Sequence, residues 1–143
     1  MVYQTTKRIL DIAFALFVIV ILWGVLLGAW LAVKLTSPGS GIFTQQRIGK
    51  GGLPLNCYKF RTMSLGTKEA STHEVTADSV TTVGQFSQKT QIDELPQIWN
   101  ILKNELSLVG RSPCLPVQRE LMSARSELGV LDEIGGITGW AQI

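Results

Sequence analysis

Hydrophobic and polar positions divide the chain into one long apolar segment and a mixed remainder. From Ile12 to Val33, 22 consecutive residues lack a polar side chain. A helix of that length rises about 33 Å at ~1.5 Å per residue, close to the ~30 Å hydrocarbon core of a bilayer. The pattern therefore predicts a membrane helix within residues 1–35 and a small separate domain in residues 36–143.

Two segments with strand-like alternation follow the apolar run. Residues 42–49 and 53–63 flank Lys50-Gly51-Gly52, a tight-turn sequence. This arrangement predicts a β-hairpin. In its second strand, Lys59 and Arg61 share one face because side chains alternate with a period of two. The hairpin should therefore present cations on one side.

Apolar positions return at helical spacing in the second half of the chain. Residues 64–89 are rich in Ser, Thr and Gln and should form loops with one short helix. A helix is then expected from Asp93 to about Asn104, with its apolar face at Leu95, Ile98, Trp99 and Leu102. A second helix is expected over 115–128, and residues 135–140 should form a glycine-rich loop. The predicted class is α/β, mostly helical, with amphipathic or interfacial helices beside the hairpin.

The net charge is only +2, so the placement of charge is more informative. Lys7 and Arg8 precede the apolar run, and a richer basic group follows it: Lys34, Arg47, Lys50, Lys59 and Arg61. Basic residues concentrate on the cytoplasmic flank of a membrane helix. Two basic flanks leave two topologies open: a spanning helix with the domain inside, or a re-entrant helix that returns to the same face. No nucleic-acid partner is expected.

Leader and cysteine patterns favour a cytosolic-side domain. The apolar run is longer than the usual ~7–15 residues of a signal peptide, and no clear cleavage site follows it. Cys57 and Cys114 lack metal-like spacing and are interpreted as free thiols. His73, the only histidine, stands among polar residues and is not expected to be catalytic.

The acid pair Asp93–Glu94 is the main candidate for chemistry. If Asp93 is the N-cap of the predicted helix, Pro96 falls at N3, where its missing N–H costs nothing. The helix dipole would then keep both acids ionised. Such a pair could bind a metal, accept a proton or act as a nucleophile. It could also be an ordinary helix cap.

Cations near the pair give a possible phosphate site. Arg111 follows the predicted helix, and Lys59 and Arg61 share a strand face. Cations, acids and a helix N-terminus together suit phosphate. Mg²⁺ binds through one or two carboxylates plus substrate phosphates. Alternatively, the same cations could form a solvated face or attract anionic lipid headgroups. Neither a P-loop nor a GxGxxG pattern is present.

An ordered series of motifs resembles the bacterial sugar transferase family, the small monotopic polyprenyl-phosphate phosphoglycosyl transferases. The resemblance covers nearly the whole chain. Besides the apolar run, the motifs are Lys7-Arg8 with Asp11, Ser37-Pro38-Gly39, Gln46-Arg47-Ile48-Gly49, Tyr58-Lys59-Phe60-Arg61-Thr62-Met63, Asp93-Glu94-Leu95-Pro96-Gln97, Ser107-Leu108-Val109-Gly110 and Gly136-Ile137-Thr138-Gly139-Trp140-Ala141-Gln142.

The resemblance implies a specific reaction. Members of the family move a phospho-sugar from a UDP-sugar to membrane polyprenyl phosphate, which releases UMP and forms a polyprenyl diphosphate sugar. This is the first membrane step of bacterial glycan assembly, as for lipopolysaccharide or exopolysaccharide. The resemblance also implies a ping-pong route with Asp93 as nucleophile, Glu94 beside it and Mg²⁺ as cofactor, held by both acids.

Location and substrate contacts follow from the same resemblance. It implies a re-entrant helix in the cytoplasmic (inner) membrane, with the catalytic domain on the cytoplasmic face. The candidates for substrate contacts are Lys59, Arg61, Arg111 and Arg47. The sugar, the polyprenyl length and the oligomeric state are left open.

The chain departs from the family pattern at four places. Before the acid pair the family usually has several basic residues, whereas here only Lys89 remains and the places are taken by Ser79, Thr82, Gln85 and Gln88. Trp23-Gly24 stands where the family has Ser-Pro, and Arg111 lies one place early relative to Gly-Pro-Arg-Pro. The family also continues beyond Gln142, so residues 36–143 are expected to lack a C-terminal part. The rival hypothesis is a non-catalytic membrane-anchored module, in which Asp93 only caps a helix and the basic face binds headgroups or a protein.

Overall fold

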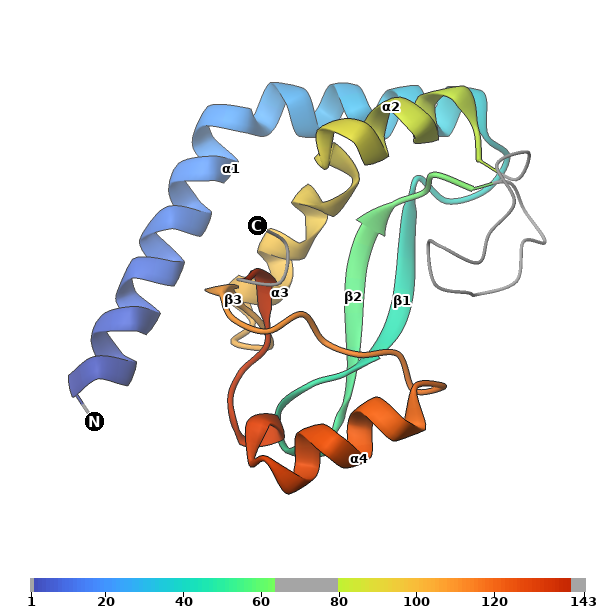
Figure 1. The fold of residues 1–143 in the computed structure, drawn as a ribbon. Coiled ribbons are helices and arrows are strands. Elements are labelled where there is room, and N and C mark those ends of the chain that lie inside the picture. Colours follow the sequence, from blue (N-terminus) through green and yellow to red (C-terminus); the bar gives the residue numbers. More distant parts are fainter. Residues whose placement is uncertain (1, 64–79, 140–143) are drawn as a thin grey trace.

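A long bent helix lies against a small mixed domain in the computed structural model, which describes residues 2–63 and 80–139. Helix α1 (Val2–Thr36) bends about half-way along, and its concave side faces the other elements (Figure 1). Within the described residues it is the one helix long and apolar enough to cross a membrane. Only 11% of its most apolar window is buried. The predicted α/β class with an apolar N-terminal helix is confirmed.

The predicted hairpin is confirmed with nearly the expected bounds. Strands β1 (Ile42–Ile48) and β2 (Pro54–Phe60) pair antiparallel and are joined by the 3₁₀ turn η1 (Lys50–Gly52). Gly51 and Gly52 both have positive φ, 66° and 75°, a conformation that favours glycine. Because β2 ends at Phe60, Arg61 lies just outside the strand.

The helix expected from Asp93 is divided into several pieces. It consists of the 3₁₀ helix η3 (Ile92–Gln97) and α3 (Ile98–Leu102). Helix α2 (Thr82–Thr90) precedes them and agrees with the one short helix expected within residues 64–89. Asp93 therefore does not begin an α-helix, and that prediction was wrong. Pro96 disfavours the α conformation at the residue before it, so the regular helix forms only after the proline.

The C-terminal part also differs from its prediction. Helix α4 (Arg119–Glu127) is shorter than the expected 115–128, because a turn precedes it in which Leu115 and Gln118 bond to each other: the Gln118 N–H donates to the Leu115 carbonyl and the Leu115 N–H to Gln118 Oε1. The expected glycine-rich loop contains strand β4 (Gly136–Thr138), which pairs parallel with β3 (Ser107–Val109). A Cβ at Gly136 would meet the backbone of Gly110, so glycine permits this close approach. A 3₁₀ turn, η4 (Val130–Asp132), precedes β4.

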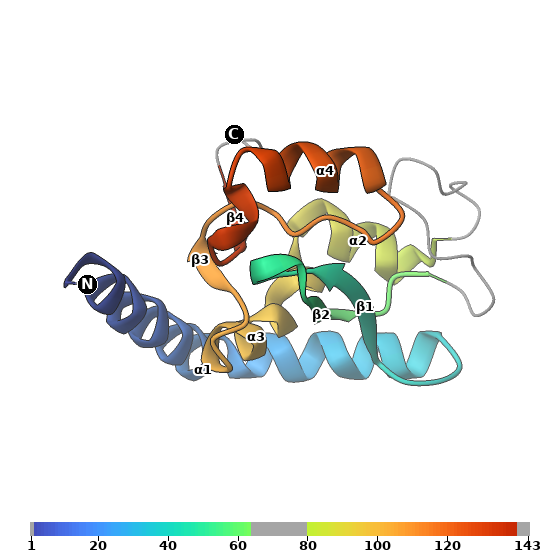
Figure 2. The ribbon, with the colours of Figure 1, turned by 90° about the horizontal axis from the view of Figure 1, so that it is seen from below.

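Helix α1 takes part in the core of the domain. The main buried cluster draws on α1, β2, α3 and the segment before β3, and consists of Ala15, Val18, Leu55, Cys57, Ile98, Ile101 and Leu106. Seen from below, α1 lies on one side of the hairpin and α4 on the other (Figure 2). The element that carries the acid pair therefore lies on the membrane-helix side of the molecule.

The cysteine prediction is confirmed, and the histidine prediction falls outside the structure. Cys57 and Cys114 are both buried and free. Burial raises the pKa of the Cys57 thiol to about 11, so this thiol is unreactive at neutral pH. His73 and the rest of 64–79 lie outside the described residues.

Candidate active site

The acid pair lies in η3, which packs against strand β2. Asp93 is 8% exposed, whereas Glu94 is partly exposed. Lys59 of β2 donates to Glu94 Oε1 at 2.7 Å. The hairpin thus brings a cation to the pair from 35 positions earlier in the chain. The sequence-based grouping of Lys59 with the two acids agrees with this geometry.

Asp93 is buried without the stabilisation of a helix cap. The N-cap of η3 is Gln91, and no side-chain hydrogen bond caps the helix. Burial raises the pKa of the Asp93 carboxyl to about 6; the charge of Lys59 lowers it, and that of Glu94 raises it. The expectation that a helix start would favour the ionised form of Asp93 is therefore wrong. Burial raises its pKa by more than Lys59 and a backbone hydrogen bond lower it. Acids with pKa values shifted towards neutrality are typical of functional sites.

Asn100 fixes the position of the strand that carries Lys59. It is fully buried, and its Nδ2 donates to the carbonyl of Asn56 and to Glu105 Oε2, both at 2.7 Å. Its Oδ1 accepts from the backbone N–H of Tyr58 at 3.2 Å. This residue was missed from the sequence. The available signal was a single amide in a run of apolar residues, since a polar group that such a run buries needs partners.

The three other predicted cations make no hydrogen bond or ion pair with the acid pair in the described residues. Arg47 donates to Gln45 Oε1 and to the carbonyl of Pro113, and Arg61 donates to the carbonyl of Pro38. Arg111 Nε is buried and has no hydrogen-bond partner within the described residues. Burial, and then the charge of Arg125, lower the pKa of the Arg111 guanidinium.

Arg111 instead lines a groove of about 630 Å³, with both apolar and polar lining residues, beside the start of α1 and strand β3. Lys7, Asp11, Lys50 and Ser107 also line it. The acid pair is not part of its lining. Polar residues are therefore gathered at two separate places, and of the four predicted substrate cations only Lys59 has a polar contact with the acid pair.

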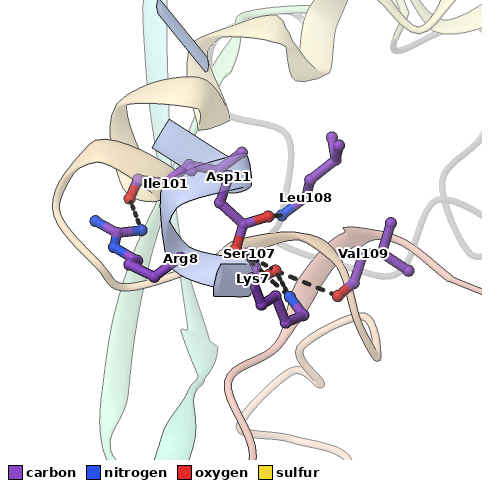
Figure 3. Close-up of polar contacts among 7 residues, drawn as sticks. All are labelled: Lys7, Arg8, Asp11, Ile101, Ser107, Leu108 and Val109. Atoms are coloured by element: carbon purple, nitrogen blue, oxygen red, sulfur yellow. Dashed lines mark hydrogen bonds and ion pairs between the residues drawn. The ribbon is translucent and has the colours of Figure 1, made fainter. Parts of the chain in front are cut away.

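A buried polar cluster ties α1 to the domain (Figure 3). Asp11 accepts from Ser107 Oγ at 2.7 Å and from the backbone N–H of Leu108 at 3.0 Å, and Lys7 donates to both Asp11 and Ser107. One turn away, Arg8 donates to the carbonyl of Ile101 at 2.6 Å. Because a cation suits the C-terminal end of a helix, Arg8 also stabilises α3.

The donor set at the pair is compatible with Mg²⁺. Residues 2–63 and 80–139 contain no group of three or more His, Cys, Asp or Glu that could hold a metal. Mg²⁺ does not need such a group, since it commonly binds one or two carboxylates together with substrate phosphates. Asp93 and Glu94 supply two oxygen ligands of the required kind. A cation beside them would also offset the unfavourable burial of Asp93.

The fold combines a bent apolar helix with an α/β domain, and an acid pair lies in an element that packs against this helix. These features define a membrane-associated α/β protein with an acidic site. The family model described as bacterial sugar transferase matches residues 2–143. The chain therefore belongs to the bacterial sugar transferase family, as its ordered motifs indicated.

Relatives with specific names support this membership. The chain is 38% identical over 99% of its length to the UDP-glucose:undecaprenyl-phosphate glucose-1-phosphate transferase of Escherichia coli, and 37% identical over 96% to the protein of that name in Caulobacter vibrioides. It is 34% identical over 99% to the UDP-N-acetylgalactosamine-undecaprenyl-phosphate N-acetylgalactosaminephosphotransferase of Aeromonas hydrophila. The chain covers 32%, 53% and 34% of these relatives.

Proposed function

We propose that the chain is a phosphoglycosyl transferase that moves a sugar 1-phosphate from a UDP-sugar to polyprenyl phosphate. The observation that supports this proposal most directly is the state of Asp93: it is a buried acid with a pKa of about 6, beside the Lys59–Glu94 ion pair. The element that holds it packs against the membrane helix. The relatives' names supply the two substrate classes.

The proposed mechanism has two displacements at phosphorus. An ionised oxygen of Asp93 attacks the sugar-bearing phosphorus of the UDP-sugar, and the bond to UMP breaks. A phosphate oxygen of polyprenyl phosphate then attacks the same phosphorus, which breaks its bond to Asp93 and forms the diphosphate. One difficult step becomes two easier ones. A carboxylate with a raised pKa is more basic than an exposed one and still mostly ionised at pH 7.

Lys59, Glu94 and Mg²⁺ complete the proposed site. Lys59 offers a positive charge to substrate phosphate, and Glu94 holds Lys59 at 2.7 Å. Asp93 and Glu94 would hold Mg²⁺, which supplies charge neutralisation at a phosphoryl group when bound. Glu94 Oε2 makes no hydrogen bond within the described residues and is the oxygen free for this role.

We place α1 as a re-entrant helix in the bacterial inner membrane, with the domain on the cytoplasmic face. Three observations support this topology. The helix is bent rather than straight (Figure 1), and basic residues flank both of its ends. Arg8 and Asp11 also hold the start of α1 on the domain that follows its end. Both ends of the apolar segment are thereby associated with the same domain.

The rival hypothesis of a non-catalytic module loses one of its supports. It required Asp93 to be a helix cap, but the structure has no side-chain cap at the start of η3. A buried, uncapped acid without a chemical role would be a net cost to the fold.

The direct test is detection of the covalent intermediate. The protein in detergent or nanodiscs is mixed with Mg²⁺ and a panel of UDP-sugars without acceptor. We expect about one UMP per protein and a sugar-phosphate mass adduct on Asp93. Asp93→Asn should lose both, whereas the exposed control Asp132→Asn should retain them. Turnover by Asp93→Asn at the wild-type rate would refute the mechanism.

A further inference from the structure

An apolar groove lies directly beside the acid pair. Its volume is about 300 Å³, at the lower end of the range for ligand pockets. Membrane helix α1, the hairpin, η3 and α3 all contribute to its lining. The lining surface is almost wholly apolar, so the groove cannot satisfy the hydrogen bonds of a uridine or a sugar.

One wall of the groove comes from the membrane segment. Ile19 and Leu26 line it from α1, seven positions apart and therefore on one helical face. Both belong to the uninterrupted apolar run. A molecule in the groove would therefore contact the same helix that the surrounding lipid contacts.

The opposite wall of the groove is formed by η3 and α3, starting at the residue that follows the acid pair. Leu95 and Pro96 line the groove and directly follow Glu94 in η3, with Trp99 one turn further along. Tyr58 also lines it and is the neighbour of Lys59 in β2. In a strand, consecutive side chains point to opposite faces, so Tyr58 does not itself bring Lys59 to the groove. The link is Glu94, which directly precedes the lining residue Leu95 and accepts a hydrogen bond from Lys59.

The polar end of Tyr58 is already bonded. Lys103 Nζ donates to the Tyr58 hydroxyl at 2.9 Å and lies 4.9 Å from the ring centroid. The phenol oxygen therefore does not need a hydrogen bond from a bound molecule, and the ring contributes apolar surface to the groove.

We propose that this groove holds the isoprenoid chain of the polyprenyl phosphate acceptor, with the phosphate end at Lys59 and Asp93. The inference rests on the proposed function and adds the location of the lipid substrate. Charge and polarity select this occupant: an apolar chain fits the lining, and its anionic end reaches the lysine at the acid pair. The first isoprene units fill the groove and the rest of the chain continues into the bilayer.

Photolabelling tests the location without requiring turnover. The protein in nanodiscs is given undecaprenyl phosphate with a diazirine on an isoprene unit near the phosphate. We expect adducts on residues 95–99 and on the Ile19–Leu26 face, removed by excess undecaprenyl phosphate but not by phosphatidylglycerol. Adducts only on outward residues such as Phe17 and Val20, or equal competition by the phospholipid, would place an ordinary acyl chain there and overturn the proposal.

A groove-filling variant tests the consequence for the reaction. Leu26→Trp should raise the KM for polyprenyl phosphate about tenfold relative to wild type. Its matched control, Val20→Trp, adds the same side chain at an outward position that is 69% exposed and should leave KM unchanged. Rates are normalised to the Asp93 adduct, whose formation needs no acceptor.

The two hypotheses fail separately. If wild-type protein forms no adduct with any UDP-sugar, the proposed function fails, and photolabelling still decides what occupies the groove. If the adduct forms normally and Leu26→Trp matches Val20→Trp in KM, the groove assignment fails alone.

Discussion

Asp93 illustrates how the surroundings of one residue change the meaning of a sequence motif. The sequence places an acid before a proline at an apparent helix start, which suggests a cap. The structure instead buries the carboxyl and leaves the N-cap position to Gln91. Desolvation then raises the pKa of Asp93 from 3.8 to about 6. The residue therefore destabilises the fold when ionised, and the proposed role as nucleophile would account for its presence.

This cost predicts a stabilising but inactivating substitution. Because the folded pKa lies above the unfolded value, the contribution of Asp93 to stability is greatest below pH 4 and is lost as the pH rises through about 6. A shift of about two units corresponds to ~3 kcal/mol, which partial solvation reduces to about 2 kcal/mol. Asp93→Asn should raise the free energy of unfolding by this amount at pH 7.5 and by much less at pH 4.

Denaturant unfolding in one detergent at both pH values measures the effect. The exposed control Asp132→Asn should show no comparable difference between them. An Asp93→Asn variant that is less stable than wild type at pH 7.5 would contradict the assignment of Asp93 as a costly buried acid.

Lys59 should set the pH dependence of the first half-reaction. The rate of UMP release without acceptor, at one fixed Mg²⁺ concentration, should rise with pH to a plateau, because only the ionised carboxylate is a nucleophile; Mg²⁺ at the pair should place the midpoint below the metal-free pKa of about 6. Lys59 lowers the pKa of Asp93, so Lys59→Met should move the midpoint to higher pH and slow the reaction at pH 7. The exposed control Lys50→Met should have the wild-type profile. An unshifted midpoint in Lys59→Met would exclude this coupling.

At the scale of elements, long patterns could be predicted and short ones could not. The apolar run and the alternating hairpin have clear periods, and both are present with nearly the expected bounds. Strands β3 and β4 have three residues each, too few to show a period. Their parallel pairing depends on a close backbone approach at Gly136, which only tertiary structure reveals.

The junction between α1 and β3 predicts a specific loss of stability. Asp11→Ala removes the acceptor of Ser107 Oγ and of the Leu108 N–H. An unsatisfied buried donor costs about 1–3 kcal/mol, so we expect a loss of about 2–3 kcal/mol. Amide exchange at Leu108 should accelerate, while the exposed control Asp132→Ala should leave both stability and exchange unchanged. Unaltered protection of Leu108 would show that the junction is not formed in solution.

At the scale of the whole molecule, the acid pair could be predicted from sequence, but only part of its surroundings could. Lys59 was predictable because its strand face and the acids belong to recognisable motifs. The hydrogen bond of Arg61 and the burial of the Arg111 guanidinium are set by neighbours distant in the chain, which no local pattern encodes. The role of Asn100 depends on the same tertiary contacts.

The membrane topology of α1 can be tested by labelling single introduced cysteines. Both native thiols are buried, so a membrane-impermeant maleimide should report mainly on introduced sites. Tyr3→Cys and Gln46→Cys flank the helix at exposed positions. In sealed inverted vesicles both should react, because a re-entrant helix keeps both flanks on the cytoplasmic face. Trp23→Cys, exposed on the protein but expected in lipid, should stay unlabelled. Reaction at only one flank would establish a spanning helix.

The bonds of Arg8 and Asp11 also have a consequence for biosynthesis. Their partners Ile101 and Leu108 lie 93 and 97 positions later in the chain. At a synthesis rate of about 5–20 residues per second, roughly 5–20 seconds pass before those partners exist. During this interval the Asp11 carboxylate has no protein donor from β3, and hydration keeps it at the bilayer surface. Under the proposed re-entrant topology, we therefore expect the start of the nascent helix to stay at the bilayer surface until β3 has been synthesised.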